Sequence, residues 1–120
     1  MRRRAVACAL LVLLAGAGGA RAHAFLERAE PRVGSTVRTP PAEVKLWFTE
    51  RLEPAYSRVQ VVGEGGERVD RADALVDRDN RALLRVSLAS LAAGSYKVVW
   101  RVVSVDTHVT EGEFTFRVAP

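Results

Sequence analysis

Sulfur and histidine are scarce in this sequence. Its 120 residues include one cysteine, one methionine and two histidines. Cys8 and Met1 both fall in the first 22 residues, a segment that we expect to be removed on export. A chain that begins at His23 can therefore form no disulfide and has no thiol nucleophile. It also offers no soft sulfur ligand for a monovalent metal ion.

The excess of basic residues is confined to the same start of the chain. Lys and Arg number 18 against 14 Asp and Glu, which gives a formal net charge of +4. Four of the arginines precede His23, so the remaining chain carries equal numbers of basic and acidic residues. The composition therefore lends no support to binding of nucleic acid or of an anionic membrane.

Residues 1–22 have the organisation of a secretory signal peptide. A basic start is followed by an apolar run over residues 5–14, and Ala20-Arg21-Ala22 fits the small-x-small pattern before a cleavage point. A membrane span would need about 20 apolar residues, and this run is shorter. We expect cleavage after Ala22, export of the remaining chain and a single domain over residues 23–120. No later segment is apolar enough to cross a bilayer.

The exported part of the chain has the pattern of a β protein. Apolar and polar residues alternate in runs that begin at Val44, Tyr96 and Phe114, and further strands are expected over residues 58–62 and 81–88. The glycine-rich residues 63–66 predict a hairpin turn. We expect a loop or edge strand over residues 70–80, and one helical turn or a tight loop over residues 90–94. About seven short strands predict an all-β fold, an immunoglobulin-like or Greek-key β-sandwich.

The candidate chemistry lies in residues 104–108. In an extended chain alternate residues share a face, so Asp106 and His108 would point the same way, about 7 Å apart. One carboxylate and one imidazole could then converge on a single ion. The other histidine, His23, directly follows the expected cleavage point. Cleavage there frees an α-amine, which can close a six-membered chelate ring on a metal together with Nδ1 of the same residue.

Six different short motifs are spread along the exported chain. They are His23-Ala-Phe-Leu, Pro31-x-x-Gly34, Pro41-x-x-Val44-x-Leu46-x-Phe48-x-Glu50, Leu88-x-x-Leu91-x-x-Gly94-x-Tyr96-x-Val98-x-Trp100-Arg101, Ser104-x-Asp106-x-His108 and Gly112-x-Phe114-x-Phe116. Together they resemble the CopC family of periplasmic copper-binding proteins over essentially all of residues 23–118. The specific part is the N-terminal histidine combined with Asp-x-His before the last strand.

The resemblance implies a ligand set and a function. It implies that one Cu(II) ion is held by the amine and imidazole of His23 together with Asp106 and His108, with Glu50 nearby as a candidate to accept a hydrogen bond from a bound water or a ligand N–H. It also implies a non-enzymatic copper carrier or buffer in copper homeostasis and resistance. A CopD-like membrane copper transporter is a candidate partner, and we expect a monomer, with a copper-bridged dimer as the alternative.

Two features depart from the family pattern. The family usually has Asp-Gly-His-Pro where this chain has Thr107 and Val109 at the second and fourth positions. Some members also carry a Met-rich Cu(I) site, and the exported chain has no methionine from which to build one.

The implied donors suit cupric ion. Three nitrogens and one oxygen match the tetragonal preference of Cu(II), which binds most tightly among the divalent first-row metals. Zn(II) could use the same ligands but prefers a tetrahedral arrangement. Since the amine and the imidazoles must lose protons to bind a metal, affinity should fall as the pH drops below neutral.

Other interpretations of the same residues stay open. Taken alone, Asp106 and His108 would be ordinary turn or loop residues. A hydrolase triad that includes Ser104 is disfavoured, because side chains at i, i+2 and i+4 of one strand run parallel and do not converge. An N-terminal histidine with a second histidine is also the brace of copper oxidoreductases, although Asp106 would fill the position where oxygen should bind. A metal-free immunoglobulin-like interaction module would be supported if the exported protein began elsewhere than His23.

Overall fold

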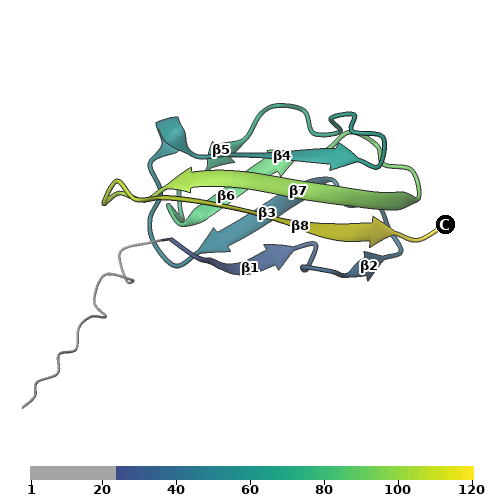
Figure 1. The fold of residues 1–120 in the computed structure, drawn as a ribbon, viewed down its shortest axis with the longest axis horizontal. Coiled ribbons are helices and arrows are strands. Elements are labelled where there is room, and N and C mark those ends of the chain that lie inside the picture. Colours follow the sequence, from purple (N-terminus) through teal and green to yellow (C-terminus); the bar gives the residue numbers. More distant parts are fainter. Residues whose placement is uncertain (1–23) are drawn as a thin grey trace, which may run out of the picture.

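The computed structural model describes residues 24–120, which fold into a two-layer β-sandwich (Figure 1). The expected signal peptide, residues 1–22, and His23 lie outside the described residues. The strands are β1 (Leu26–Glu30), β2 (Thr36–Val37), β3 (Glu43–Phe48), β4 (Arg58–Gly63), β5 (Leu75–Val76), β6 (Leu83–Ser87), β7 (Gly94–Val103) and β8 (Val109–Val118), with a 3-10 turn at Pro54–Tyr56. Within residues 24–120, no helix has the length and apolar character that crossing a membrane requires.

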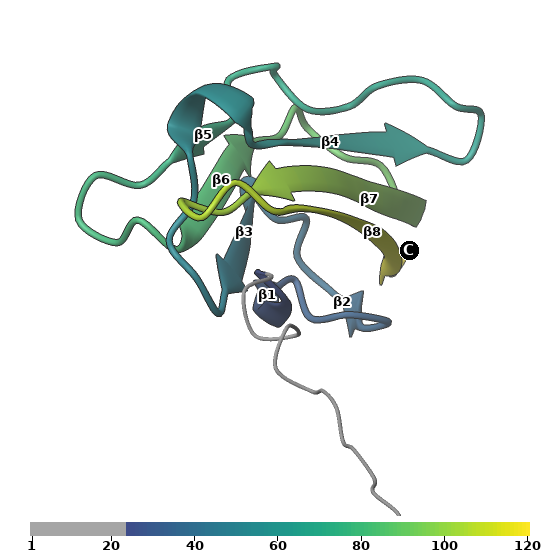
Figure 2. The same cartoon turned by 60° about the vertical axis from the view of Figure 1, so that its left-hand side comes forward.

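The strands form two four-stranded sheets that face each other across the core (Figure 2). One sheet has the order β1-β3-β6-β5 and the other the order β2-β8-β7-β4. Neighbouring strands are antiparallel, except that β2 runs parallel to β8. The predicted all-β sandwich is confirmed, with two-residue strands β2 and β5 lying at sheet edges.

The alternation in the sequence becomes the division between core and surface. In β3 the side chains of Val44, Leu46 and Phe48 are buried, whereas their neighbours along the strand are more exposed. Strands β7 and β8 repeat this pattern from Tyr96 and Phe114 onward. Fully burying one such apolar side chain contributes about 1.5–3 kcal/mol, so this alternation favours the sandwich over alternatives that would expose the same faces.

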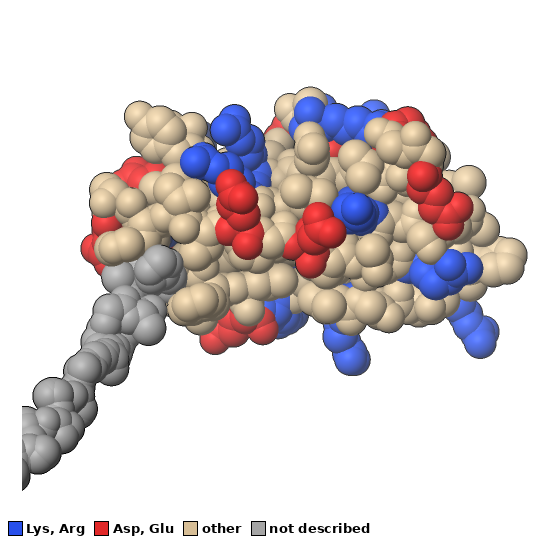
Figure 3. Space-filling model, viewed as in Figure 1, with Lys and Arg blue, Asp and Glu red and all other residues tan. Residues whose placement is uncertain are grey.

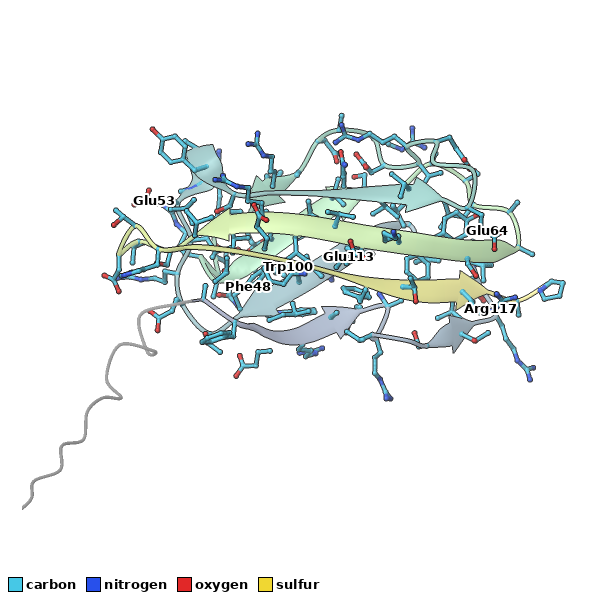
Figure 4. All side chains as sticks on the ribbon, in the orientation of Figure 1. Phe48, Glu53, Glu64, Trp100, Glu113 and Arg117 are labelled. Atoms are coloured by element: carbon cyan, nitrogen blue, oxygen red, sulfur yellow. The ribbon has the colours of Figure 1, made fainter. Side chains whose placement is uncertain are left out.

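One aromatic pair joins the two sheets across the core, and a second pair lies within one sheet. Phe48 of β3 and Trp100 of β7 meet edge to face, with ring centroids 5.1 Å apart (Figure 4). Tyr96 stacks on Phe116 of the adjacent strand at 5.6 Å. Because the Phe48–Trp100 contact crosses from one sheet to the other, it fixes the two layers relative to each other as well as excluding water.

The outward face of β7 and β8 carries both signs of charge. Figure 3 shows basic and acidic side chains interspersed over this face. Arg101 of β7 pairs with Glu111 of β8 at 3.1 Å, and Lys97 lies 3.8 Å from Glu113. This face therefore carries paired charges of both signs, as expected for an exported chain with equal numbers of basic and acidic residues.

Two local predictions need correction or refinement. Residues 90–94 contain no helical turn, so the alternative prediction of a tight loop is the correct one. The last strand was expected from the alternating run that begins at Phe114, but β8 begins at Val109 and pairs Gly112 with Trp100. The last strand is therefore longer than the alternation alone suggested.

Candidate metal centre

The candidate donors Asp106 and His108 lie in the tight loop that joins β7 to β8. The last residue pair of this hairpin is Val103 with Val109, so residues 104–108 form the loop. The segment is not extended, so the shared face expected for an extended chain does not apply: the chain turns at residues 105 and 106, and Thr107 has a φ of 69°. Alternation along a strand thus does not bring Asp106 and His108 together. The turn keeps them in one short loop instead.

Ser104 organises this loop from inside the protein. Its side chain is fully buried, and its amide donates to the carbonyl of His108 at 3.0 Å. Its hydroxyl accepts a 3.3 Å hydrogen bond from the amide of His108. Its carbonyl accepts a 2.7 Å hydrogen bond from the amide of Thr107, whose own hydroxyl donates to the carbonyl of Asp106. The loop backbone is therefore fixed while Asp106 and His108 remain exposed to solvent.

The segment that follows β3 runs antiparallel beside the loop. Leu52 forms a bridge with Ser104, and the amide of Val105 donates to the carbonyl of Arg51 at 3.0 Å. The amide of Glu53 donates to the carbonyl of Val103 at 2.8 Å. These bonds tie the segment that follows β3 of one sheet to the β7–β8 hairpin of the other.

The first described residues reach the same end of the sandwich. Ala24 is fully buried, and its carbonyl accepts a 2.8 Å hydrogen bond from the hydroxyl of Thr110 in β8. The amide of Phe25 donates to the Thr49 hydroxyl, and the amide of Thr49 donates back to the carbonyl of Phe25, each at 2.9 Å. The start of the described chain is thus anchored beside both the hairpin and the end of β3.

Glu50 lies between two residues that are hydrogen-bonded to neighbouring segments. The residue before it, Thr49, is bonded to Phe25, and the residue after it, Arg51, is bonded to Val105. The three predicted residues that the structure describes, Glu50, Asp106 and His108, therefore belong to segments that meet. The fourth, His23, lies outside the described residues but is covalently linked to Ala24, which is held at this end.

The described residues supply only part of a donor set. Within residues 24–120 no group of three or more histidine, cysteine, aspartate or glutamate side chains is arranged to hold a metal. Asp106 and His108 would supply two donors, and the prediction assigns the others to His23.

Sequence reasoning missed the positioning roles of the residues that hold these segments in place, including Ser104, which it had noted only as part of a motif and of a disfavoured triad. Thr49, Thr110 and Ser104 act through hydrogen bonds to backbone groups. The partners of the two threonines are separated from them by 24 and 86 residues. No periodicity or local spacing could have revealed such contacts.

Comparison with known proteins places the chain in a family. The model of the CopC domain matches residues 26–119. The chain belongs to the CopC family. Among curated relatives, it is 37% identical over 98 residues to Protein YobA of Escherichia coli (strain K12), covering 81% of this chain and 79% of that protein. It is 32% identical over 105 residues to Copper resistance protein C of Pseudomonas syringae pv. tomato, covering 82% of each.

Solved CopC structures share the fold. CopC from Methylosinus trichosporium OB3b superposes with a TM-score of 0.73 at 36% identity, over 82% of this chain and 95% of that chain. PcoC, a copper resistance protein from Escherichia coli, gives a TM-score of 0.69 at 29% identity, over 78% of this chain and 98% of that chain. The resemblance inferred from the motifs is thereby confirmed.

Proposed function

We propose that this protein is an exported, non-enzymatic Cu(II) carrier that contributes to copper homeostasis and resistance. One ion per chain would be held by the α-amine and imidazole of His23 together with Asp106 and His108. The observation that carries the proposal is the meeting of two segments: the hydrogen bond from Thr110 to Ala24 holds the residue after His23 next to the loop that bears Asp106 and His108.

The chemistry of these donors supports copper over harder cations. Two imidazoles and an amine supply nitrogen, the donor type that divalent copper favours, and the single carboxylate offsets part of the charge of the ion. Calcium and magnesium would instead require a site composed of oxygen atoms. Membership of a family that includes Copper resistance protein C of Pseudomonas syringae pv. tomato and PcoC of Escherichia coli supports the same metal.

The exposure of the donors supports a carrier. Asp106 and His108 both lie in a solvent-exposed loop, so an ion could enter or leave without unfolding the sandwich. A buried site surrounded by the core would exchange metal only through local opening. An open site at one end of the molecule therefore suits a protein that receives and releases its ion.

Further parts of the proposal concern location and partners. Residues 1–22 would direct export to the periplasm, and their cleavage after Ala22 would generate the free amine of His23. Glu50, next to the segments that meet here, would accept a hydrogen bond from a metal-bound water or ligand N–H and so orient it. A CopD-like membrane transporter would be a recipient of the ion, and the carrier would act as a monomer.

The proposal is tested by an equilibrium titration of Cu(II) into the exported protein, after its mass has established that it begins at His23. We expect one tightly bound ion per chain and an EPR spectrum with nitrogen hyperfine structure. Replacement of both Asp106 and His108 by alanine should remove tight binding. As a matched control, the double substitution Asp79→Ala and Arg78→Ala, in an exposed loop, should leave the titration unchanged. Unchanged binding in the Asp106/His108 variant would refute the assignment.

A further inference from the structure

We infer that Thr110 is a positioning residue for copper binding, because its hydroxyl holds the amino-terminal segment against the strand that continues from His108. This inference rests on the proposed function and adds to it a residue that binds no metal. Thr110 is the second residue of β8 and follows His108 by two positions. It donates a 2.8 Å hydrogen bond to the carbonyl of Ala24, 86 residues away in sequence.

Burial and neighbouring hydrogen bonds keep the Ala24 carbonyl attached to Thr110. Ala24 is fully buried, so its carbonyl cannot turn to solvent for another partner without a rearrangement. The next residue, Phe25, is fixed independently by its two hydrogen bonds with Thr49 at the end of β3. The start of the chain is therefore attached to both sheets, whereas the first residues of most domains are poorly ordered.

The attachment limits how far the first donor can move. His23 is joined to Ala24 by one peptide bond, so their Cα atoms are about 3.8 Å apart. With Ala24 held, the point at which His23 joins the described chain is fixed beside the hairpin. Holding Ala24 in place before the metal arrives reduces the conformational entropy that this segment loses on binding. Thr110 would thereby increase copper affinity without contacting the ion.

The substitution Thr110→Val isolates the hydroxyl. Valine keeps the β-branched shape and suits a strand, but it cannot donate a hydrogen bond to Ala24. In the protein that begins at His23, we expect Thr110→Val to weaken Cu(II) binding by about 10- to 100-fold, the range typical of residues that orient metal ligands. Affinity is measured by competition with a chromophoric copper chelator. Thr110→Ser, which retains the hydroxyl, should restore most of the affinity.

A second measurement separates positioning from general stability. In the metal-free protein, the NMR order parameter of the Ala24 amide should fall in Thr110→Val and return in Thr110→Ser. Thr115 lies on the same strand but faces outward, so Thr115→Val serves as the control and should change neither Ala24 order nor copper affinity. Wild-type affinity in Thr110→Val would overturn the inference, as would weaker binding with an unchanged Ala24 order parameter.

The outcomes also distinguish this inference from the proposed function. If the wild-type protein that begins at His23 takes up no Cu(II), the proposed function fails and Thr110 has no role in binding, whatever the order parameters show. If the wild-type protein binds Cu(II) tightly and Thr110→Val binds it equally well, the proposed function stands and the inference fails alone.

Discussion

Ser104 and His108 close the loop of the β7–β8 hairpin through two mutual hydrogen bonds. The amide of Ser104 donates to the carbonyl of His108 at 3.0 Å, and the amide of His108 donates to the hydroxyl of Ser104 at 3.3 Å. Ser104 is fully buried, whereas His108 is exposed. A buried residue thus determines the backbone position of an exposed donor.

Ser104→Ala should therefore weaken copper binding as well as the fold. Loss of the hydroxyl leaves the His108 amide without this acceptor, and a hydrogen bond of this kind contributes about 0.5–1.5 kcal/mol. We expect a loss of stability of that size in urea denaturation of the metal-free protein, and a severalfold loss of Cu(II) affinity in a competition titration.

Ser57→Ala provides the matched control for this prediction. Ser57 is also buried, and its hydroxyl accepts a 3.1 Å hydrogen bond from the amide of Val103, at the end of β7 and outside the loop. We expect Ser57→Ala to lower stability similarly and to retain most of the copper affinity. Equal losses of affinity in the two variants would show that the effect of Ser104 reflects only general destabilisation.

Asp70 should make the fold sensitive to acid. Its side chain is fully buried and accepts hydrogen bonds from the amides of Val61 at 2.7 Å and Ala72 at 2.8 Å, and from Arg68 Nε at 2.9 Å. Burial raises the pKa of Asp70, but these hydrogen bonds and the charge of Arg68 together outweigh it, so its pKa lies below the ordinary value of 3.8. The ionised form therefore stabilises the fold above that value, and this contribution is lost as the pH falls through the lowered pKa.

Asp70→Asn should cost about 1.5–3 kcal/mol of unfolding free energy at pH 7, since it removes a charged acceptor of several hydrogen bonds. Guanidinium denaturation at pH 7 and at pH 3 measures the effect, and the difference in unfolding free energy between wild type and variant should be smaller at pH 3. Asp79→Asn, at an exposed position in the following loop, should have the unfolding free energy of the wild type at both pH values. A difference that widens in acid would contradict the sign of the pKa shift.

Gly112→Ala should destabilise the sandwich at the level of Trp100. A methyl group built on Gly112 would lie 2.9 Å from Cε2 of Trp100 and closer still to Cζ2. The ring cannot move freely, because it also packs against Phe48, with ring centroids 5.1 Å apart. Overpacking of this kind typically costs about 1–3 kcal/mol. Thermal unfolding and tryptophan fluorescence would show the loss, and Glu113→Ala on the outward face should leave both nearly unchanged.

The fold could be predicted from the sequence because burial in a sandwich follows a period of two. Val44, Leu46 and Phe48 alternate with less buried neighbours, and the structure places them on the core face as expected. The short strand β2 was not predictable in this way. It has two residues and pairs in parallel with the distant β8, so its sequence carries too little pattern to mark it.

For the candidate site, the sequence suggested donors, which stay a prediction, but not how the chain presents them. Asp106 and His108 stood out as residue types, but their segment is not extended, since the bonds of Ser104 turn the chain there. The contact from Thr110 to Ala24 depends on how the two sheets close over each other. Tertiary packing determines such contacts, and no local sequence pattern predicts them.

Copper affinity should depend on pH because protons compete with the metal for the amine and imidazole nitrogens. We expect affinity to fall steadily as the pH is lowered from 8 to 5, and to fall less steeply in His108→Ala, which has one fewer nitrogen to protonate. Competition titrations across this range measure the slope. A constant affinity would mean that the bound ion uses oxygen donors alone.

The most direct test concerns the amine of His23. Two proteins are compared by Cu(II) titration with EPR detection: one begins at His23, and the other keeps Ala22 at its start, so that the nitrogen of His23 lies in a peptide bond. We predict tight binding with the nitrogen-rich spectrum for the first protein, and much weaker binding with a different spectrum for the second. Identical affinity and identical spectra in the two proteins would contradict the account.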